Sequence, residues 1–343
     1  MGIRYAYTGT GFRDWTRRLG DYERGFLLGL YRSMLRIRIV EEEIEKRYHE
    51  DRMKTPIHLV IGQEATSVGC CAALRDSDQL YSSHRTHGNY LAKGGDLKAM
   101  LAEMFCRATG CVGSRGGSMH LIDKKVGMAG TSAIVGGAIP IATGAALAAK
   151  MQGLDRVCVV FLGEAGVEEG VASESLNFAA LKQLPVVFFC ENNFYSVQSP
   201  LSARQPPARV IWKWAASYGM PAVQVDGTNV LAVYEASREA VARARAGGGP
   251  TFIEAPVYRF RAHGGTGDDS ASGYRDVAER ELWERHCPIA TYYRFLEGAG
   301  LISAREEQAM RSEILAETLA AFDYAEASPE PQEADLYRNV YAP

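Results

Sequence analysis

Residues 157–193, VCVVFLGEAGVEEGVASESLNFAALKQLPVVFFCENN, decide the fold class of this chain. The segment begins with an apolar run at 157–163, continues with a stretch of helical spacing at 168–184, and ends with a second apolar run at 185–193. Strands that are apolar on both faces and are separated by a helix are typical of a parallel sheet covered by helices on both sides. The segment therefore predicts two parallel strands joined by a crossover helix.

The same alternation continues toward the C-terminus. Apolar runs at 221–227 and 251–259 predict two more strands, and residues 229–247 between them have the spacing of a helix. We therefore expect a doubly wound parallel α/β sheet, flanked by helices, in one domain that covers residues 25–325. Further expected segments are helices at 25–50, 63–74, 96–105, 140–150, 276–286 and 302–322, an ordered Gly- and Ser-rich loop at 113–138, an N-terminal arm at 1–24 and a C-terminal tail at 326–343.

The composition of the chain narrows the range of partners. With 343 residues and a net charge of -3, the chain has no basic surplus for nucleic acid, so a small-molecule substrate or a protein partner is expected. No apolar stretch is long enough to span a bilayer, and the N-terminal residues lack the apolar core of a secretory signal. The seven cysteines include no C-x-x-C pair, which is typical of reduced thiols. We expect a cytoplasmic protein that binds neither nucleic acid nor membrane.

Polar side chains follow the two apolar runs of the opening segment. Glu164 comes one residue after the first run, and Asn193 ends the second. Ligands bind at the carboxyl ends of parallel strands, and an oxygen pair there is the ligand type that Mg²⁺ or Ca²⁺ prefers. Because Mg²⁺ usually completes its shell with waters and phosphate oxygens, the pair suggests a diphosphate held by a metal ion. Each residue alone has a simpler explanation, since acids are favoured at helix N-termini and asparagine is common in turns. Glu168 and Glu169 are expected to be such first-turn acids. No dinucleotide-binding G-x-G-x-x-G or P-loop motif is present.

A strand ending in Gly and an acid, a helix, and a strand ending in Asn-Asn resemble the GDG...NN signature of thiamine diphosphate enzymes. Further motifs resemble, in order, those of the alpha chain of the decarboxylating component of 2-oxo acid dehydrogenases, a group with pyruvate, branched-chain and acetoin members. The resemblance extends from about residue 25 to the tail. These motifs are IHLVIGQEA (57–65), HRTHG (84–88), SRGGSMH (114–120), SAIVGGAIPIATGAALA (132–148), LNFAALKQLPVVFFCENNFYS (176–196) and AHGGTGDD (262–269).

The resemblance implies a set of site residues. Glu164, Asn193 and the backbone carbonyl of Tyr195 would bind Mg²⁺ together with diphosphate oxygens, and the guanidinium of Arg85 would pair with the diphosphate. His263 would be catalytic, because in this family the matching histidine orients the substrate and assists acyl transfer to a lipoyl group. The implied cofactor-binding residues are His58, His84, Arg85, Ala133, Ile134, Val135, Gly163, Glu164, Ala165, Gly166, Asn193, Tyr195 and His263.

The chain departs from the family pattern at several of these positions. Glu164 replaces the usual aspartate of GDG, Ala165 replaces its second glycine, and His84 replaces the usual tyrosine before the arginine. Beside His263, relatives carry hydroxyl-bearing or larger residues where this chain has a pair of glycines at 264–265. The extra methylene of Glu164 changes the reach to a metal whose octahedral geometry tolerates little deviation.

The resemblance also implies a function and a partner. The chain would be the alpha subunit of a thiamine diphosphate- and Mg²⁺-dependent enzyme that acts on a small 2-oxo acid or on acetoin and passes the acyl group to a lipoyl acyltransferase. The glutamate that activates the aminopyrimidine ring belongs to a beta subunit in this family, so we expect an alpha2-beta2 assembly and an inactive isolated chain. Two alternatives remain open: a carboligase subunit of a specialised pathway, and a scaffold subunit without metal binding.

Overall fold

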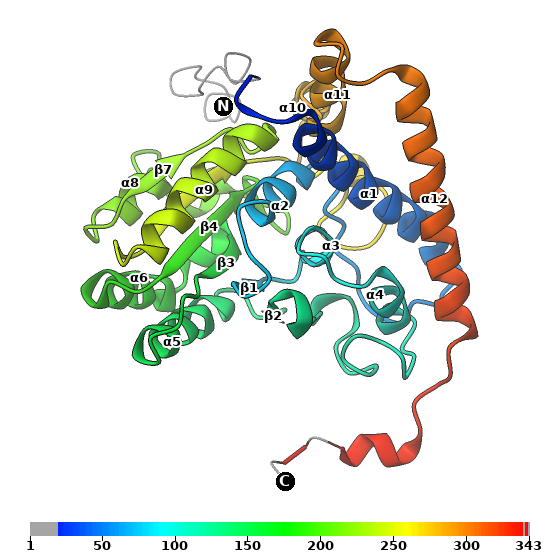
Figure 1. Ribbon diagram of the computed structural model, residues 1–343, viewed down its shortest axis with the longest axis horizontal. Coiled ribbons are helices and arrows are strands. Elements are labelled where there is room, and N and C mark those ends of the chain that lie inside the picture. The colour runs from blue at the N-terminus through cyan, green and yellow to red at the C-terminus, as the bar shows by residue number, and fades with distance from the viewer. Residues whose placement is uncertain (1–19, 339, 342–343) are drawn as a thin grey trace.

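The computed structural model describes residues 20–338 and 340–341, apart from the side chains of residues 270 and 271 (Figure 1). Most of the expected N-terminal arm, 1–24, lies outside these residues. The centre of the described part is a six-stranded parallel sheet with the order β2-β1-β3-β4-β8-β7. The strands are β1 (Gln79–Ser82), β2 (Met128–Thr131), β3 (Cys158–Gly163), β4 (Val186–Asn192), β7 (Ala222–Gln224) and β8 (Thr251–Pro256).

Alternate residues of the central strands enter two separate apolar cores, one on each face of the sheet. In β3, Val159 and Phe161 belong to one core, and Val160 and Leu162 belong to the other. This division follows from the period of two along a strand, and it explains why the run is apolar at every position. The doubly wound parallel sheet predicted from the sequence is confirmed.

Helices cover both faces of the sheet (Figure 1). The helices whose apolar residues join the first core are α1 (Arg24–Tyr48), α2 (Glu64–Cys71), α3 (His87–Ala92), α4 (Leu97–Met104), α9 (Val230–Arg245), α10 (Val277–Arg285), α11 (Pro288–Gly298) and α12 (Ala304–Ala327). Those that join the second core are α5 (Ala138–Met151), α6 (Gly170–Lys182) and α8 (Ile211–Ala216).

The helices α1 and α12, from the two ends of the chain, lie side by side (Figure 1). Three arginines of α1 form ion pairs with three glutamates of α12, and the partners advance in the same direction, so the two helices are parallel. Such exposed pairs contribute about 0.2 to 1 kcal/mol each, so the apolar contacts beneath them carry most of the stability. The pairs are Arg24–Glu306, Arg32–Glu313 and Arg36–Glu317, with N–O distances of 2.7, 2.9 and 2.7 Å.

Several short elements differ from the sequence-based expectations. The strands β1 and β2 were not predicted, and β2 lies inside the segment 113–138 that was expected to be a loop. The strand expected at 221–227 is reduced to β7, which has three residues. A two-stranded hairpin, β5 (Tyr195–Ser196) and β6 (Ser199–Pro200), follows β4 and leads into the short helix α7 (Leu201–Arg204).

Among the described residues, no helix has the length and apolar character that a membrane span requires.

The cysteines form no disulfide. All seven lie in the described part of the chain as free thiols, and Cys70, Cys71, Cys158 and Cys190 are buried. Burial raises the pKa of Cys70 and of Cys158 to about 12, which keeps these thiols protonated and unreactive near neutral pH. They behave as small apolar core residues.

Candidate active site

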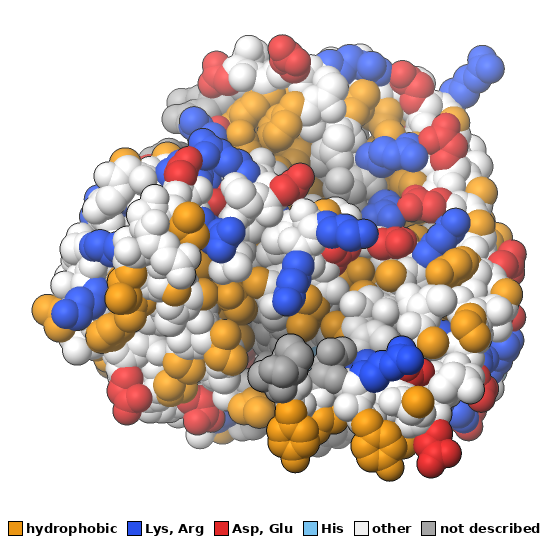
Figure 2. Space-filling model, turned by 60° about the horizontal axis from the view of Figure 1, so that its bottom comes forward, with side chains coloured by type: hydrophobic (Ala, Val, Ile, Leu, Met, Phe, Trp, Pro, Cys, Tyr) orange, Lys and Arg blue, Asp and Glu red, His pale blue; other side chains and the backbone are white. Residues whose placement is uncertain are grey.

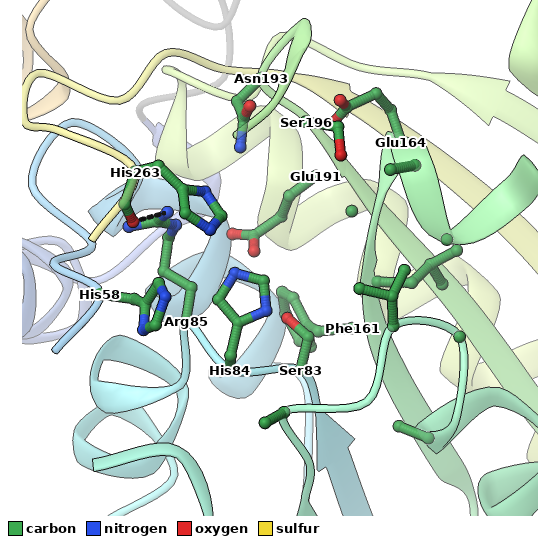
Figure 3. A pocket seen from close by; sticks show the side chains of 18 of the residues that line it. His58, Ser83, His84, Arg85, Phe161, Glu164, Glu191, Asn193, Ser196 and His263 are labelled. Atoms are coloured by element: carbon green, nitrogen blue, oxygen red, sulfur yellow. Dashed lines mark hydrogen bonds between the residues drawn. The ribbon is translucent and has the colours of Figure 1, made fainter. Parts of the chain in front are cut away.

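A cavity of about 210 Å³ lies at the carboxyl ends of β1, β3 and β4 (Figure 3). The chain leaves β1 toward β2 and leaves β3 toward β4 on the opposite side, and open α/β sheets bind ligands at such a point of divergence. Every residue that the sequence predicted for the site lines this one cavity: His58, His84, Arg85, Ala133, Ile134, Val135, Gly163, Glu164, Ala165, Gly166, Asn193, Tyr195 and His263.

Glu164 begins the 3-10 segment η5 (Glu164–Glu168), which directly follows β3. Its side chain is only 2% exposed, and its Oε1 accepts a hydrogen bond from Nη2 of Arg204 at 2.6 Å. Burial raises the pKa of Glu164, and the positive charge of Arg204 opposes that rise. The guanidinium of Arg204 also binds Glu168 at 2.5 Å. Glu168 is therefore part of an ion-pair network. The prediction of Glu168 and Glu169 as first-turn acids of the next helix is wrong, because α6 begins only at Gly170, after its N-cap residue Glu169.

Asn193 lies between β4 and the β5–β6 hairpin. Its Oδ1 accepts a hydrogen bond from the backbone N–H of Tyr195 at 3.2 Å, and its Nδ2 donates to Gln63 at 3.4 Å. The hydroxyl of Tyr195 donates to Glu279 at 2.6 Å, which fixes the hairpin against α10. These contacts fix the amide of Asn193 and the backbone of Tyr195, and both residues line the cavity together with Glu164. Figure 3 shows the side chains of Asn193 and Glu164 at the cavity.

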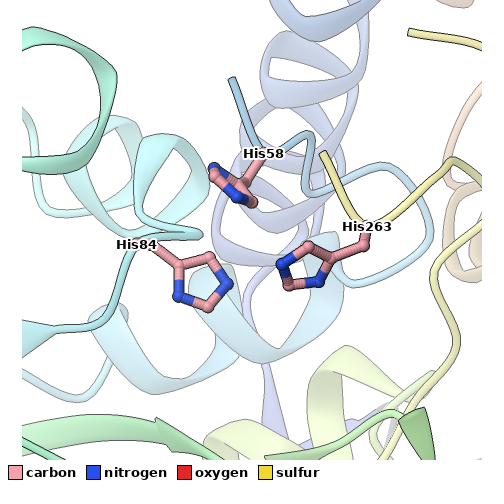
Figure 4. A group of neighbouring side chains, drawn as sticks. All are labelled: His58, His84 and His263. Carbon is pink, nitrogen blue, oxygen red and sulfur yellow. The ribbon is translucent and has the colours of Figure 1, made fainter. Parts of the chain in front are cut away.

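Three histidines and a buried arginine line the other side of the cavity (Figures 3 and 4). The ring centroids of His58, His84 and His263 are 4.5 to 5.4 Å apart. The guanidinium of Arg85 donates hydrogen bonds to the carbonyl of Leu59 and, at 2.8 Å, to that of His263. Arg85 therefore joins the loops that carry His58 and His263, although the sequence suggested only a role in phosphate binding.

Burial and nearby arginines keep the three imidazoles neutral. Burial, with the charge of Arg85, lowers the pKa of His58 to about 2, that of His84 to about 3 and that of His263 to about 4. Ring atoms of the three histidines lie within 4.8 Å of one another, which is close enough to suggest a metal site in the described part of the chain. However, the field of Arg85 that disfavours a proton on these rings also disfavours a cation between them. The group suits neutral hydrogen bonding to an anionic or polar ligand better than it suits a metal.

Comparison with known proteins assigns the family. The dehydrogenase E1 component family matches residues 31–334. The chain belongs to this family. Dehydrogenase E1 components are oxidoreductases, and the family generally uses thiamine diphosphate.

Relatives of this dehydrogenase E1 component are alpha subunits by name. The chain is 39% identical to the alpha subunit of acetoin:2,6-dichlorophenolindophenol oxidoreductase of Bacillus subtilis (strain 168), over 92% of this chain and 93% of the relative. It is 38% identical to subunit alpha-3 of the chloroplastic pyruvate dehydrogenase E1 component of Arabidopsis thaliana, over 92% of this chain and 74% of the relative. It is 35% identical to the pyruvate dehydrogenase E1 alpha subunit of Rhizobium meliloti (strain 1021), over 94% and 92%.

The cavity also contains an acid to which the sequence assigned no role. Glu191, near the end of β4, lines the cavity and is 6% exposed. Its carboxyl accepts a hydrogen bond from the hydroxyl of Thr66 and points toward the side of the cavity where the histidines lie (Figure 3). Burial raises the pKa of Glu191 to about 7, against an ordinary value of 4.5. Its position before Asn192 and Asn193 was visible in the sequence, but its burial was not.

A buried polar network supports the segment that carries His58 at the cavity. Ring nitrogens of His87 lie 2.5 Å from Glu41 and 2.7 Å from Ser118, so an acid, a histidine and a serine are linked as in a catalytic triad. All three side chains are fully buried, and none is among the residues that line the described cavity, so Ser118 has no access to a substrate. The second oxygen of Glu41 accepts from the backbone N–H of Val60 at 2.6 Å, which fixes the loop two residues after His58.

Proposed function

We propose that this chain is the diphosphate-binding alpha subunit of a thiamine diphosphate- and Mg²⁺-dependent enzyme that acts on pyruvate, a similar small 2-oxo acid, or acetoin. The observation that carries this proposal is the convergence of every site residue of the family pattern on one cavity at the sheet edge. The named relatives act on pyruvate or acetoin, which supports these two substrates as the first to test.

The residues of the cavity fit this cofactor. Glu164 offers a carboxylate, Asn193 an amide oxygen and Tyr195 a backbone carbonyl, and such oxygen ligands suit Mg²⁺ with a diphosphate in its shell. Two buried nitrogen atoms of cavity residues, Nδ1 of His58 and Nε2 of Gln63, have no hydrogen-bond partner among the described residues. Buried polar atoms are normally paired, so these orphaned atoms are consistent with a polar ligand.

The chain's own residues would bind the metal and the cofactor and would orient the substrate. Bound thiamine diphosphate supplies the carbon nucleophile that attacks the substrate carbonyl. Glu164, Asn193 and the carbonyl of Tyr195 would hold the metal, and the backbone at 133–135 would contact the aminopyrimidine ring. His263, neutral near pH 7 because its pKa is lowered to about 4, can donate or accept a hydrogen bond at the substrate carboxyl or the acyl group without the cost of losing a charge.

A beta subunit would complete the site. Ile134 and Val135 line the cavity and are 72% and 47% exposed, which is unusual for apolar side chains at a ligand site. Exposed apolar residues continue on α5 and α6, where Ile141, Met151 and Leu181 are 57%, 77% and 72% exposed. Figure 2 shows hydrophobic side chains gathered in several places on the face of the molecule that it presents. Apolar surface of this kind marks a protein interface, and an alpha2-beta2 assembly would cover it.

The test is reconstitution with a beta subunit of the same family. Calorimetry should detect thiamine diphosphate binding that requires Mg²⁺, and the assembled subunits should reduce 2,6-dichlorophenolindophenol with pyruvate or acetoin as substrate. The chain without a beta subunit should reduce no dye. Turnover by the isolated chain would contradict a site built from two subunits. If the assembled subunits show no Mg²⁺-dependent binding of thiamine diphosphate, the chain is better explained as a scaffold subunit. Formation of a new C–C bond without dye reduction would favour the carboligase.

A further inference from the structure

Arg204 connects the two chain segments that carry the proposed metal ligands. It ends α7, which follows Asn193 and the β5–β6 hairpin that contains Tyr195, and its guanidinium reaches across to η5. There Nη2 binds Glu164 at 2.6 Å and Nη1 binds Glu168 at 2.5 Å. The side chain is 13% exposed, and its Nε donates to the carbonyl of Ser199 at 3.3 Å.

The carboxylate of Glu164 is the group for which Arg204 and a metal would compete. A carboxylate that is 2% exposed requires a positive partner, because an unpaired buried charge is strongly unfavourable. Arg204 provides that partner in the described structure. A Mg²⁺ ion on the same carboxylate would lie within a few ångströms of the guanidinium, and like charges at such a distance repel strongly in a partly buried site.

Glu168 gives Arg204 a second acceptor. The side chain of Glu168 is 26% exposed and also accepts a hydrogen bond from Nε2 of Gln205 at 2.7 Å. If Nη2 releases Glu164, Nη1 can keep its contact with Glu168, so the loop stays attached to η5. Metal binding then breaks one of the two ion pairs rather than both.

We propose that Arg204 competes with the divalent metal for Glu164 and so makes metal binding conditional on the diphosphate. The formal charges of Glu164, Glu168 and Arg204 sum to -1, and a Mg²⁺ ion would bring that sum to +1. The negative charge of a diphosphate reverses this excess, so metal and diphosphate should bind together. This inference rests on the proposed function, because it takes Glu164 as a metal ligand. Arg204 is a positioning residue in this scheme, since it acts through Glu164.

The test measures metal binding directly. Mn²⁺, another hard octahedral cation, can replace Mg²⁺ as a probe whose free concentration is read by electron paramagnetic resonance. The full-length chain is titrated with Mn²⁺, with and without inorganic pyrophosphate. Arg204→Gln should bind Mn²⁺ at least about tenfold more tightly than the wild type when pyrophosphate is absent, and within about threefold of it when pyrophosphate is present.

Two variants act as controls. Arg209→Gln removes a guanidinium that contacts the carbonyl of Val167 in η5 but not Glu164, and it should leave both affinities within about twofold of the wild type. If Arg204 only anchors the loop, Arg204→Gln should weaken Mn²⁺ binding, so weaker or unchanged binding without pyrophosphate overturns the inference. That result leaves the proposed function standing as long as the wild type binds Mn²⁺ with pyrophosphate. If Glu164→Ala binds Mn²⁺ as the wild type does, the metal site itself fails.

Discussion

Replacing Glu191 by glutamine should stabilise the protein above neutral pH and have little effect in acid. The buried carboxyl of Glu191 has its pKa raised to about 7, against an ordinary value of 4.5. The raised pKa determines whether stability rises or falls with pH. Below 4.5 the group is protonated in both the folded and the unfolded chain, whereas between 4.5 and about 7 only the unfolded chain releases the proton. The stability of the wild type therefore falls as pH rises through this window and is constant above it.

The magnitude follows from the difference between the two pKa values. At about 1.36 kcal/mol per pH unit, this difference corresponds to about 3 kcal/mol, of which about 2 to 3 kcal/mol is lost between pH 5 and pH 8. Glutamine has no titrating proton, and its amide oxygen can still accept the hydrogen bond from Thr66. Glu191→Gln should therefore gain about 2 to 3 kcal/mol over the wild type between these two pH values.

The measurement is urea unfolding of the chain without cofactor at a series of pH values, followed by circular dichroism. The comparison of variant with wild type removes the contribution of the titrating groups that lie far from the substitution. A stability difference that is the same at pH 5 and pH 8 would falsify the assignment of a raised pKa to Glu191.

Three further predictions test the site and its supports. In calorimetry, Glu164→Asp should keep Mg²⁺-dependent binding of thiamine diphosphate, whereas Glu164→Ala should weaken it by at least about 100-fold, since even residues that only hydrogen-bond to metal ligands contribute 10- to 100-fold. Normal binding by the alanine variant would show that Glu164 is not a metal ligand. Glu103 is fully buried, and its carboxylate accepts hydrogen bonds from four backbone N–H groups between residues 112 and 117. Glu103→Gln should therefore lower the free energy of unfolding, measured by urea titration, by about 2 to 4 kcal/mol. An unchanged free energy would show that these hydrogen bonds are dispensable. Gly127 has φ +77°, and a Cβ there would lie 2.1 Å from the carbonyl oxygen of Asp78, so Gly127→Ala should lower the free energy of unfolding by more than about 3 kcal/mol. Gly153 has φ +64° but open space around it, so Gly153→Ala should lower it by only about 1 kcal/mol. Equal melting temperatures of the two variants would contradict the steric argument.

The central strands could be predicted because burial on both faces leaves a continuous apolar run. The run at 157–163 became β3 (Cys158–Gly163) and that at 185–193 became β4 (Val186–Asn192), each within one residue at either end. The strands β1 and β2 have only four residues each and include Gln79, Gly130 and Thr131, so they leave no such signal. Pairing with β3, on which β1 depends, is a tertiary contact that local sequence does not encode.

The site was predictable where its residues form local motifs and not where they meet only in space. Glu164 and Asn193 could be found because each follows an apolar run. Arg204 is forty positions from Glu164, in a segment without regular spacing, so its ion pair with that carboxylate could not be anticipated. The hydrogen bonds of Arg85 to carbonyls of residues 59 and 263 depend in the same way on how the loops are folded together.

The pairing of α1 with α12 has a consequence for how this protein is made. The apolar face of α1 includes Leu35, which is fully buried and belongs to the same core as Ile314 and Phe322 of α12, the helix that α1 contacts. A ribosome releases α1 roughly 280 residues before it releases α12, so at about 5 to 20 residues per second the first helix must wait on the order of tens of seconds for its partner. During that interval the part of α1 that α12 covers stays exposed in the nascent chain, and chaperones that hold exposed apolar helices should associate with it until α12 has been synthesised.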